Sequence, residues 1–399
     1  MVPLSYSVRN LRVRTTTTVA TALGIGLVVF VFATVLMLAQ GIKRTLGRSG
    51  SPDVAVVLRD GADAEMSSSL EIPSAGLILN AAEVRRRPDG RPDGVAEVLA
   101  VIILDKLGTE GVSNVAVRGV TEDVLAFRTT VRVASGRMPR PGSDECSVGA
   151  AIRGRFRGLE LGQSFEIKKN RRLTVVGFHT DNGSSYESEV WADRETVRAA
   201  FGRENTVSSV RVRLSSAGAF PALRASLEGN RQLGVDVKRE DTFYEEQSQG
   251  TSTFITAIGM LVAVFFAAGA IIGAMITMHA AVASRMREIG TLRALGFSKA
   301  SILASFLFES VVLSLLGGAV GAGAATLMRF ARLSIVNFAS WSEIVFEFTP
   351  TPGILLGSLV FAAAMGLVGG MIPAVRAARV NILDALRGGT GVPSVPAGM

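Results

Sequence analysis

Residues 284–296, with the sequence SRMREIGTLRALG, decide how this chain is built, because they join a charged segment to a long apolar one. The apolar, glycine-rich stretch from 302 to 327 follows almost at once. Ile289, Leu292 and Leu295 recur every three residues, which predicts a short amphipathic helix that Gly296 ends. Such an apolar stripe needs a surface to cover it, either lipid headgroups or a cleft on a cytosolic protein.

The apolar residues are gathered in four blocks. The chain has 399 residues, of which 48% are hydrophobic and 19% are charged. The blocks cover 17–40, 253–278, 302–328 and 353–373, and each is long enough to cross a bilayer as a helix. The first block is longer than the core of a signal peptide and lacks its small-residue cleavage pattern, so we expect an uncleaved span. The pattern predicts a membrane α-helical protein with four transmembrane helices.

The excess positive charge lies beside these blocks. The formal net charge is +8. Segment 41–250 holds thirty Lys or Arg and 29 Asp or Glu, whereas 1–16, 280–300 and 375–399 together hold ten Lys or Arg and two Asp or Glu. Basic flanks of membrane spans stay in the cytosol. We therefore expect 1–16, 280–300 and 374–399 inside, 41–250 and the loop 329–352 outside, and no nucleic-acid partner.

The segment 41–250 reads as a large α+β extracytoplasmic domain inserted between the first two transmembrane helices. Short apolar runs at 54–58, 98–104 and 115–120 predict strands. Regular glycine punctuation predicts a β-rich subdomain over about 121–210. Residues 207–214 alternate between apolar side chains and Arg211 and Arg213, so the strand predicted there turns its arginines away from the core. In the outer loop, Trp341 is typical of an interfacial anchor.

Reactive side chains are scarce. Cys146 is the only cysteine, and His179 and His279 stand apart from each other and from it. The chain has no phosphate-binding G-x-x-x-x-G-K-[ST] and no H-E-x-x-H pattern. We therefore expect no catalytic, cofactor-binding or metal-binding residues, and a chain that is not an enzyme.

Two features inside the apolar blocks predict helix contacts. Glu309 lies within the third block, and a charge exposed near a helix centre costs roughly 2.5–3.5 kcal/mol, so we expect it to have a structural partner. Small residues allow helices to approach closely. The glycines that we expect to pack in this way are Gly269, Gly273, Gly317, Gly318 and Gly321.

Several of these segments resemble one family. Residues 286–296 (MREIGTLRALG) resemble the junction of FtsX-like permeases, as in MacB-type and LolC/LolE-type ABC transporters. The surroundings of Glu309, the glycines that follow it, and the ending 372–379 (IPAVRAAR) with 385–387 (ALR) are also similar to that family. Segment 136–200 resembles the exported core domain of MacB-type proteins. The resemblance covers almost the whole chain.

The resemblance implies a function. The chain would be a permease subunit that converts ATP-driven closure of a separate nucleotide-binding subunit into motion of its exported domain, for efflux or for extraction of a lipid or lipoprotein. MacB carries its ATPase at its amino terminus, whereas this chain begins in the membrane without a phosphate loop, so we expect the ATPase on another polypeptide. The residues implied to form the ATPase-coupling helix are Arg287, Glu288, Ile289, Gly290, Leu292, Arg293, Leu295 and Gly296.

The resemblance also implies partners and a location. The partners would be a cytosolic ABC ATPase dimer that holds ATP and Mg, a second permease copy or paralogue, and a periplasmic adaptor or substrate-accepting protein. The location would be the bacterial cytoplasmic (inner) membrane. The alternative is an FtsX-like signalling permease that activates a cell-wall hydrolase, although a β-rich insert of this size fits the transporter branch better.

Overall fold

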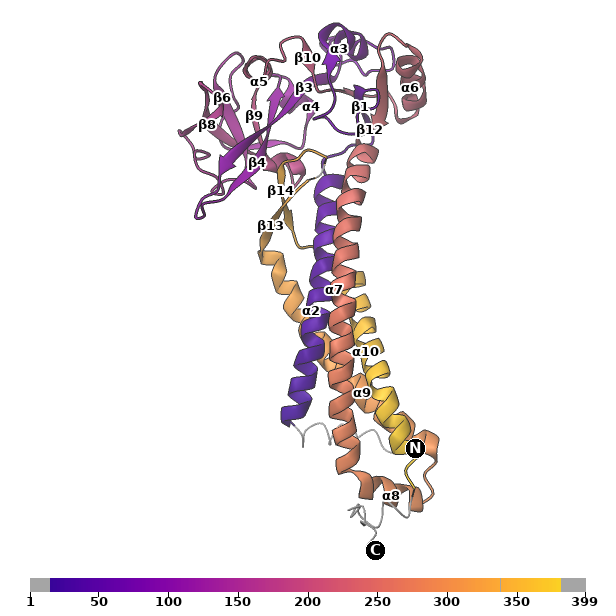
Figure 1. The fold of residues 1–399 in the computed structure, drawn as a ribbon. Helices are drawn as coiled ribbons and strands as arrows, with labels where there is room; N and C mark the ends of the chain where they lie inside the picture. Colours follow the sequence, from indigo (N-terminus) through magenta and orange to yellow (C-terminus); the bar gives the residue numbers. More distant parts are fainter. Residues whose placement is uncertain (1–14, 338, 382–399) are drawn as a thin grey trace, which may run out of the picture. The chain divides into compact units, whose positions relative to one another are not determined.

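The computed structural model describes residues 15–337 and 339–381 and divides them into two compact units (Figure 1). The sheet domain consists of Gln40–Phe254 and Arg332–Glu347, and the helical unit consists of the remaining described residues. Predictions for 1–14 and 382–399, including most of both cytosolic termini, lie outside the described residues.

The sheet domain is built on one ten-stranded sheet with the order β12-β1-β11-β3-β4-β9-β6-β8-β5, and β7 pairs with β8. The pairs β4–β9 and β6–β8 are parallel, and the other pairs are antiparallel. The strands are β1 (Val54–Arg59), β3 (Gly94–Asp105), β4 (Val112–Val120), β5 (Arg132–Gly136), β6 (Glu145–Gly149), β7 (Ser164–Lys168), β8 (Arg171–Thr180), β9 (Glu189–Asp193), β11 (Ser209–Arg213) and β12 (Val235–Arg239).

The β-rich segment expected at about 121–210 does not form a separate subdomain. Its strands β5 to β9 extend the same sheet, because β9 pairs directly with β4 and the main-chain hydrogen bonds continue without interruption. One face of this sheet is apolar, with Val98, Val117 and Val210 in a single core that includes residues of the short helices. These helices are α3 (Ile72–Leu79), α5 (Arg194–Ala200) and α6 (Phe220–Gly229), whereas Phe127 of α4 (Val124–Phe127) packs in a separate cluster with Val54 and Val95.

The predicted outer loop is a β-hairpin of β13 (Arg332–Val336) and β14 (Glu343–Glu347) that packs on the sheet domain. Lys106 Nζ lies 2.8 Å from the Glu343 carboxylate, and Arg155 Nη2 lies 3.1 Å from it. Burial raises the pKa of Glu343, but the hydrogen bonds from Lys106, Ser113 and Ser334 and the charge of Lys106 together outweigh it, and the pKa falls to about 2. Trp341, at the hairpin tip, is 62% exposed, and its carbonyl accepts a hydrogen bond from Asn114.

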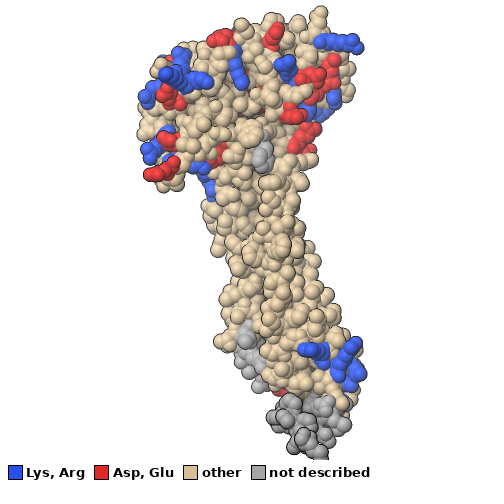
Figure 2. All heavy atoms as spheres, in the orientation of Figure 1, with Lys and Arg blue, Asp and Glu red and all other residues tan. Residues whose placement is uncertain are grey.

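The helical unit contains helices that are long and apolar enough to cross a membrane, judged by length and composition. Among the described residues there are four: α2 (Thr15–Gly47), α7 (Glu240–Ser284), α9 (Lys299–Thr326) and α10 (Pro352–Ala378). Figure 2 shows Lys, Arg, Asp and Glu crowded on the sheet domain and almost absent along the apolar helices. The helices α2 and α7 are longer than the predicted blocks, because their polar ends fold as part of the sheet domain.

Glycines bring α2 and α9 together. A Cβ atom added at Gly26 would lie 2.9 Å from the Gly317 carbonyl oxygen, and one at Gly321 would collide with the carbonyl of Gly26. Gly318 faces α10 in the same way, where an added Cβ would lie 2.5 Å from that of Ala362. These contacts leave room for no side chain at the crossing.

The last apolar helix continues beyond the predicted block, which ends at 373. The helix α10 runs through Pro373 to Ala378. Pro373 is buried, and Ala374 and Ala377 pack in a cluster with Ile302 and Phe306 of α9. Packing against a neighbouring helix compensates for the hydrogen bond that a proline removes.

Candidate functional site

The charged segment folds as the short helix α8 (Met286–Ala294), between α7 and α9 (Figure 1). The helix stops where the sequence predicts, because Gly296 adopts a φ of +91°, a left-handed conformation that glycine enters without strain. The amide of Gly296 donates to the carbonyl of Arg293 and so closes the last turn.

The apolar stripe of α8 is split between two environments, which corrects the expectation of one exposed stripe. Ile289 is buried in a cluster with Met278 and Val282 of α7 and Ile302 of α9. Leu292 is half-buried, and Leu295 is 72% exposed. Positions three apart drift by about 60° around a helix, so residues six apart lie roughly 120° from each other. One edge of α8 therefore seats the helix on its own protein, and the other edge is left open.

An ion pair fixes the start of α8. Arg285, the residue that precedes the helix, makes two contacts with Glu309 of α9, from Nη1 to Oε2 at 2.9 Å and from Nη2 to Oε1 at 3.2 Å. Both residues are buried. Glu309 thus has the structural partner that the sequence predicts, and the paired geometry gives α8 a defined direction relative to α9.

The other predicted coupling residues differ in exposure. Arg287, Glu288 and Leu295 are exposed, as is the neighbouring Thr291, whereas Gly290 is buried. Arg293 is half-buried, and its Nη1 donates to the Phe297 carbonyl. One side of α8 is thus held by the protein, and the other side exposes charges of both signs and one large apolar side chain.

In the apolar part of α7, the predicted packing pair Gly269 and Gly273 meets no neighbour. Within the described residues, no atom beyond their own helix turns lies within 4 Å of a Cβ added at either glycine. The packing role of this pair stays a prediction.

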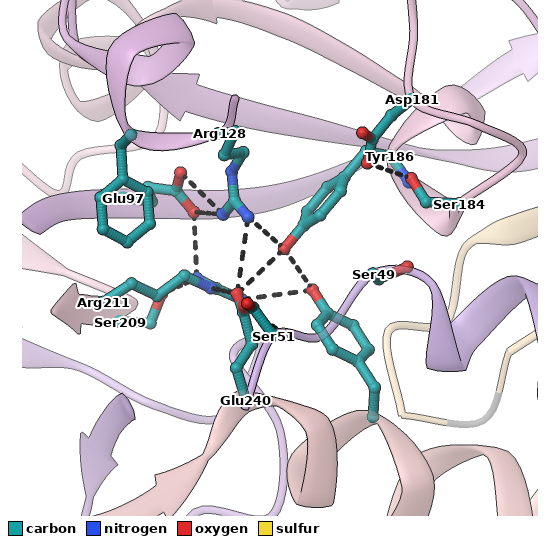
Figure 3. A network of polar contacts seen from close by, with 12 residues as sticks. Ser49, Ser51, Glu97, Arg128, Asp181, Ser184, Tyr186, Ser209, Arg211 and Glu240 are labelled. Carbon is teal, nitrogen blue, oxygen red and sulfur yellow. Dashed lines mark hydrogen bonds and ion pairs between the residues drawn. The ribbon is translucent and has the colours of Figure 1, made fainter. Parts of the chain in front are cut away.

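A second site, which the sequence did not predict, is a buried charge network in the sheet domain (Figure 3). Arg118 of β4 is 1% exposed and donates five hydrogen bonds to three carboxylates. They belong to Glu65 in the connection between β1 and α3, Glu97 of β3 and Glu189 of β9, at 2.6–3.1 Å. Burial lowers the pKa of Arg118, but these carboxylates outweigh it and hold the pKa well above its ordinary value.

Two further arginines extend the network to the first residue of α7, Glu240. Arg211 of β11 donates from Nη1 to Glu65 at 2.8 Å and from Nε to Glu240 at 2.9 Å. Arg128, at the end of α4, donates to Glu97 at 3.0 Å, and its Nη1 lies 3.5 Å from Glu240. Burial raises the pKa of Glu65, but the charges of Arg118 and Arg211 outweigh it and keep that pKa well below its ordinary value.

Two tyrosines complete the network. Tyr244, one turn into α7, donates to the hydroxyl of Tyr186 at 2.7 Å, and Arg128 donates to the same hydroxyl at 2.6 Å. Burial raises the pKa of Tyr244 to about 12, so it remains a neutral hydrogen-bond donor. The network is fixed polar packing: its carboxylates are paired with arginines and none faces a reactive group.

Arg211 corrects the prediction for 207–214. The alternation was assigned properly, but the face that carries Arg211 is covered as completely as the apolar one, and Arg211 is 0% exposed. A signal was present in the sequence, since Glu97 interrupts the apolar run of β3, and Arg118 and Arg211 each follow a valine in β4 and β11. Charges at strand centres indicate a buried ionic layer when several strands carry them with opposite signs.

His179 and Cys146, the potentially reactive residues of the sheet domain, are both buried. His179 is buried, its Nδ1 lies 2.9 Å from Ser147 Oγ, and burial lowers its pKa to about 4. Burial raises the pKa of the Cys146 thiol. Within the described part of the chain, no group of three or more His, Cys, Asp or Glu side chains is placed to hold a metal ion.

Comparison with known families agrees with this division. Residues 16–230 match the family described as MacB-like periplasmic core domain, and residues 260–382 match the FtsX-like permease C-terminal family. The second match contains α8 and the Arg285–Glu309 pair.

Curated relatives are ABC transporter proteins. The ABC transporter permease YknZ of Bacillus subtilis (strain 168) is 30% identical over 50% of this chain and 49% of its own length. The macrolide export ATP-binding/permease protein MacB of Bdellovibrio bacteriovorus is 30% identical over 47% of this chain and 29% of its own length. The matched region therefore spans about half or less of these relatives.

Among solved structures, the periplasmic region of MacB from Actinobacillus actinomycetemcomitans is similar at 15% identity, with a TM-score of 0.36, over 50% of this chain and 94% of that one. The core-domain match alone covers more than half of the 399 residues. The chain thus belongs to the ABC transporter permease family that combines a MacB-like periplasmic core domain with an FtsX-like permease segment.

Proposed function

We propose that this chain is the membrane subunit of an ABC transporter and that it converts ATP-driven closure of partner nucleotide-binding subunits into movement of the sheet domain, for export or extraction of a substrate. The observation that carries the proposal is the construction of α8. This helix is seated on α7 and α9 by Ile289, fixed by the Arg285–Glu309 pair, and open on the side of Arg287 and Leu295.

In this proposal, four helices cross the bacterial cytoplasmic membrane with both ends of the chain inside. The basic residues of 280–300 favour a cytosolic position for α8, and the near-neutral charge of the sheet domain favours a position outside. A cytosolic ABC ATPase dimer binds α8, supplies ATP and Mg, and leaves this chain without a cofactor of its own. A second permease copy completes the membrane part, and an adaptor or substrate-accepting protein meets the sheet domain.

The transport names of the relatives favour this function over activation of a cell-wall hydrolase. The matched region covers about half or less of these relatives, so their names do not indicate which substrate this chain handles. The buried charge network and the β13–β14 hairpin favour a sheet domain that moves as one rigid body.

The test is coupled ATP hydrolysis by the complex of this chain with its ATPase, reconstituted in lipid. The variant Arg287→Glu with Leu295→Asp changes two exposed residues of α8 and leaves Ile289 and Arg285 in place. We expect the variant to insert normally and to lose the permease-dependent part of ATP hydrolysis, because its docking face carries reversed charge. The matched control, Lys299→Glu, changes an exposed charge at the start of α9 and should leave hydrolysis unchanged. Normal permease-dependent hydrolysis in the double variant would refute the role given to α8.

A further inference from the structure

The start of α7 has no flexible connection to the sheet. Strand β12 ends at Arg239, and α7 begins at Glu240 and continues as one helix to Ser284. The turn after α2 packs against the first residue of α7, because a Cβ added at Gly50 would lie 2.7 Å from the Glu240 carbonyl oxygen. The chain therefore passes from sheet to helix within one residue, and a second segment lies against the junction.

The side chain of Glu240 contacts four different segments, one of which is the turn that holds Tyr186, whose hydroxyl donates to Oε1 at 3.4 Å. Its Oε1 accepts from Arg211 Nε of β11 at 2.9 Å and lies 3.5 Å from Arg128 Nη1 after α4. Its Oε2 accepts from the backbone amide of Ser51, which precedes β1, at 3.2 Å. Figure 3 shows these contacts converging on the Glu240 carboxylate. One buried carboxylate thus joins α7 to β11, to the turn that precedes β1 and to the residue that follows α4.

A second contact lies one turn further along α7. The hydroxyl of Tyr244 donates to that of Tyr186 at 2.7 Å, and Arg211 Nη2 lies 3.4 Å from Tyr244. Tyr186 lies in the turn between β8 and β9. Two points on consecutive turns of a helix fix its direction as well as its position, which a single contact would not.

The energetic argument favours a positional role for this network. Replacing buried ion pairs by apolar packing is often neutral or stabilising. The free energy lost when three arginines and four glutamates leave water therefore cancels most of the stability that their contacts contribute. Directional hydrogen bonds do fix orientation more sharply than apolar contacts. A network of this kind suits a joint that must keep one angle while force acts on it.

We infer that Glu240 and Tyr244 form a rigid joint that makes the first turns of α7 and the ten-stranded sheet one mechanical body. Glu240 is a positioning residue in this joint, acting through Arg211 and the Ser51 amide. If the proposed function holds, the joint delivers the movement of α7 to the sheet domain without loss of angle. The joint itself does not depend on ATP, a partner or a substrate.

The experiment measures spin-label distances in the full chain in phospholipid nanodiscs. One pair of labels, at Arg224 and Gln249, reports the angle between the sheet domain and α7, and both positions are exposed. A second pair, at Glu110 and Arg224, lies wholly within the body of the domain and reports whether the domain stays folded. The native cysteine is buried and is the only one in the chain, so the labels go where they are placed.

The variant Glu240→Gln keeps the size of the side chain and removes its charge. We expect loss of the single narrow distance between Arg224 and Gln249, with the Glu110–Arg224 distance unchanged. The matched control, Glu245→Gln, removes an exposed carboxylate whose hydrogen bond is with Gln249 of the same helix, and it should leave both distances narrow.

Two results would overturn the inference. Narrow distances for both pairs in Glu240→Gln would show that the angle is set elsewhere. Equal broadening of both pairs would show that the network holds the domain together and has no separate role at the joint. Neither result depends on whether an ATPase binds α8, so the proposed function stands or falls separately.

Discussion

Replacing Arg118 by Met tests whether fixed charge organises the sheet domain. The substitution removes a cation that donates five hydrogen bonds to three glutamates. In the variant, Glu65 and Glu97 keep their contacts with Arg211 at 2.8 and 3.0 Å. Among the described residues, Glu189 keeps a hydrogen bond from Trp191. Removing one partner of a buried ion pair costs about 3–5 kcal/mol. We expect a loss in this range and no more, because two of the carboxylates remain paired.

The assay is urea unfolding of the full chain in detergent micelles, followed by tryptophan emission. Trp191 is 0% exposed and its Nε1 donates to Glu189, so its emission reports the network directly. The control is Arg224→Met, because Arg224 is exposed and pairs with Glu228 one turn along the same helix. Such surface pairs contribute about 0.3–0.5 kcal/mol.

The loss should also depend on pH. The pKa of Glu65 lies well below its ordinary value of 4.5 in the folded chain, so the stability that it contributes is present above pH 4.5 and disappears as the pH falls through the folded value. The substitution Arg118→Met removes one of the two arginines that lower this pKa. The difference between variant and wild type should therefore be full near neutral pH and should shrink as the pH falls below 4.5. A loss no larger than that of Arg224→Met would refute the reasoning.

Two further predictions follow from exposure and packing. In single-cysteine labelling of sealed vesicles, Asp60→Cys and Thr291→Cys should react from opposite sides of the membrane while buried Cys146 stays unlabelled; same-side reaction would contradict the topology. Gly321→Val should destabilise the full chain by about 1–3 kcal/mol in thermal unfolding, because its side chain would collide with α2. Gly323→Val is the control, since no atom lies within 4 Å of its added Cβ, and equal effects of the two would argue against the close crossing.

The sequence predicted those parts of the fold that depend on local pattern. Apolar length and charge bias located the four apolar helices, and the three-residue repeat with Gly296 located α8 and its end. A charge inside an apolar block predicted that Glu309 has a partner, because the free-energy cost of an unpaired charge there does not depend on the fold. The partner itself, Arg285, depends on how α8 turns back onto α9.

What escaped prediction depends on contacts distant in sequence. Arg211 meets Glu65 and Glu97 across 146 and 114 residues, and no local pattern specifies such pairs. The hairpin that carries Glu343 was expected as an irregular loop, because its strands are short and pair only with each other before packing on the domain. The continuity of the sheet was missed for the same reason, since it depends on the parallel pairing of β4 with β9.

The central claim is that α8 is the surface on which a cytosolic ABC ATPase acts. The direct measurement is photo-crosslinking from benzoylphenylalanine at Thr291, an exposed position of α8, in membranes of the source organism, followed by mass spectrometry of the adduct. Benzoylphenylalanine at Thr109, an exposed position of the sheet domain, is the control. The account predicts an adduct with an ABC ATPase from position 291 and none from position 109. An ATPase adduct from 109, or adducts from 291 that contain lipid and no ATPase, would contradict it.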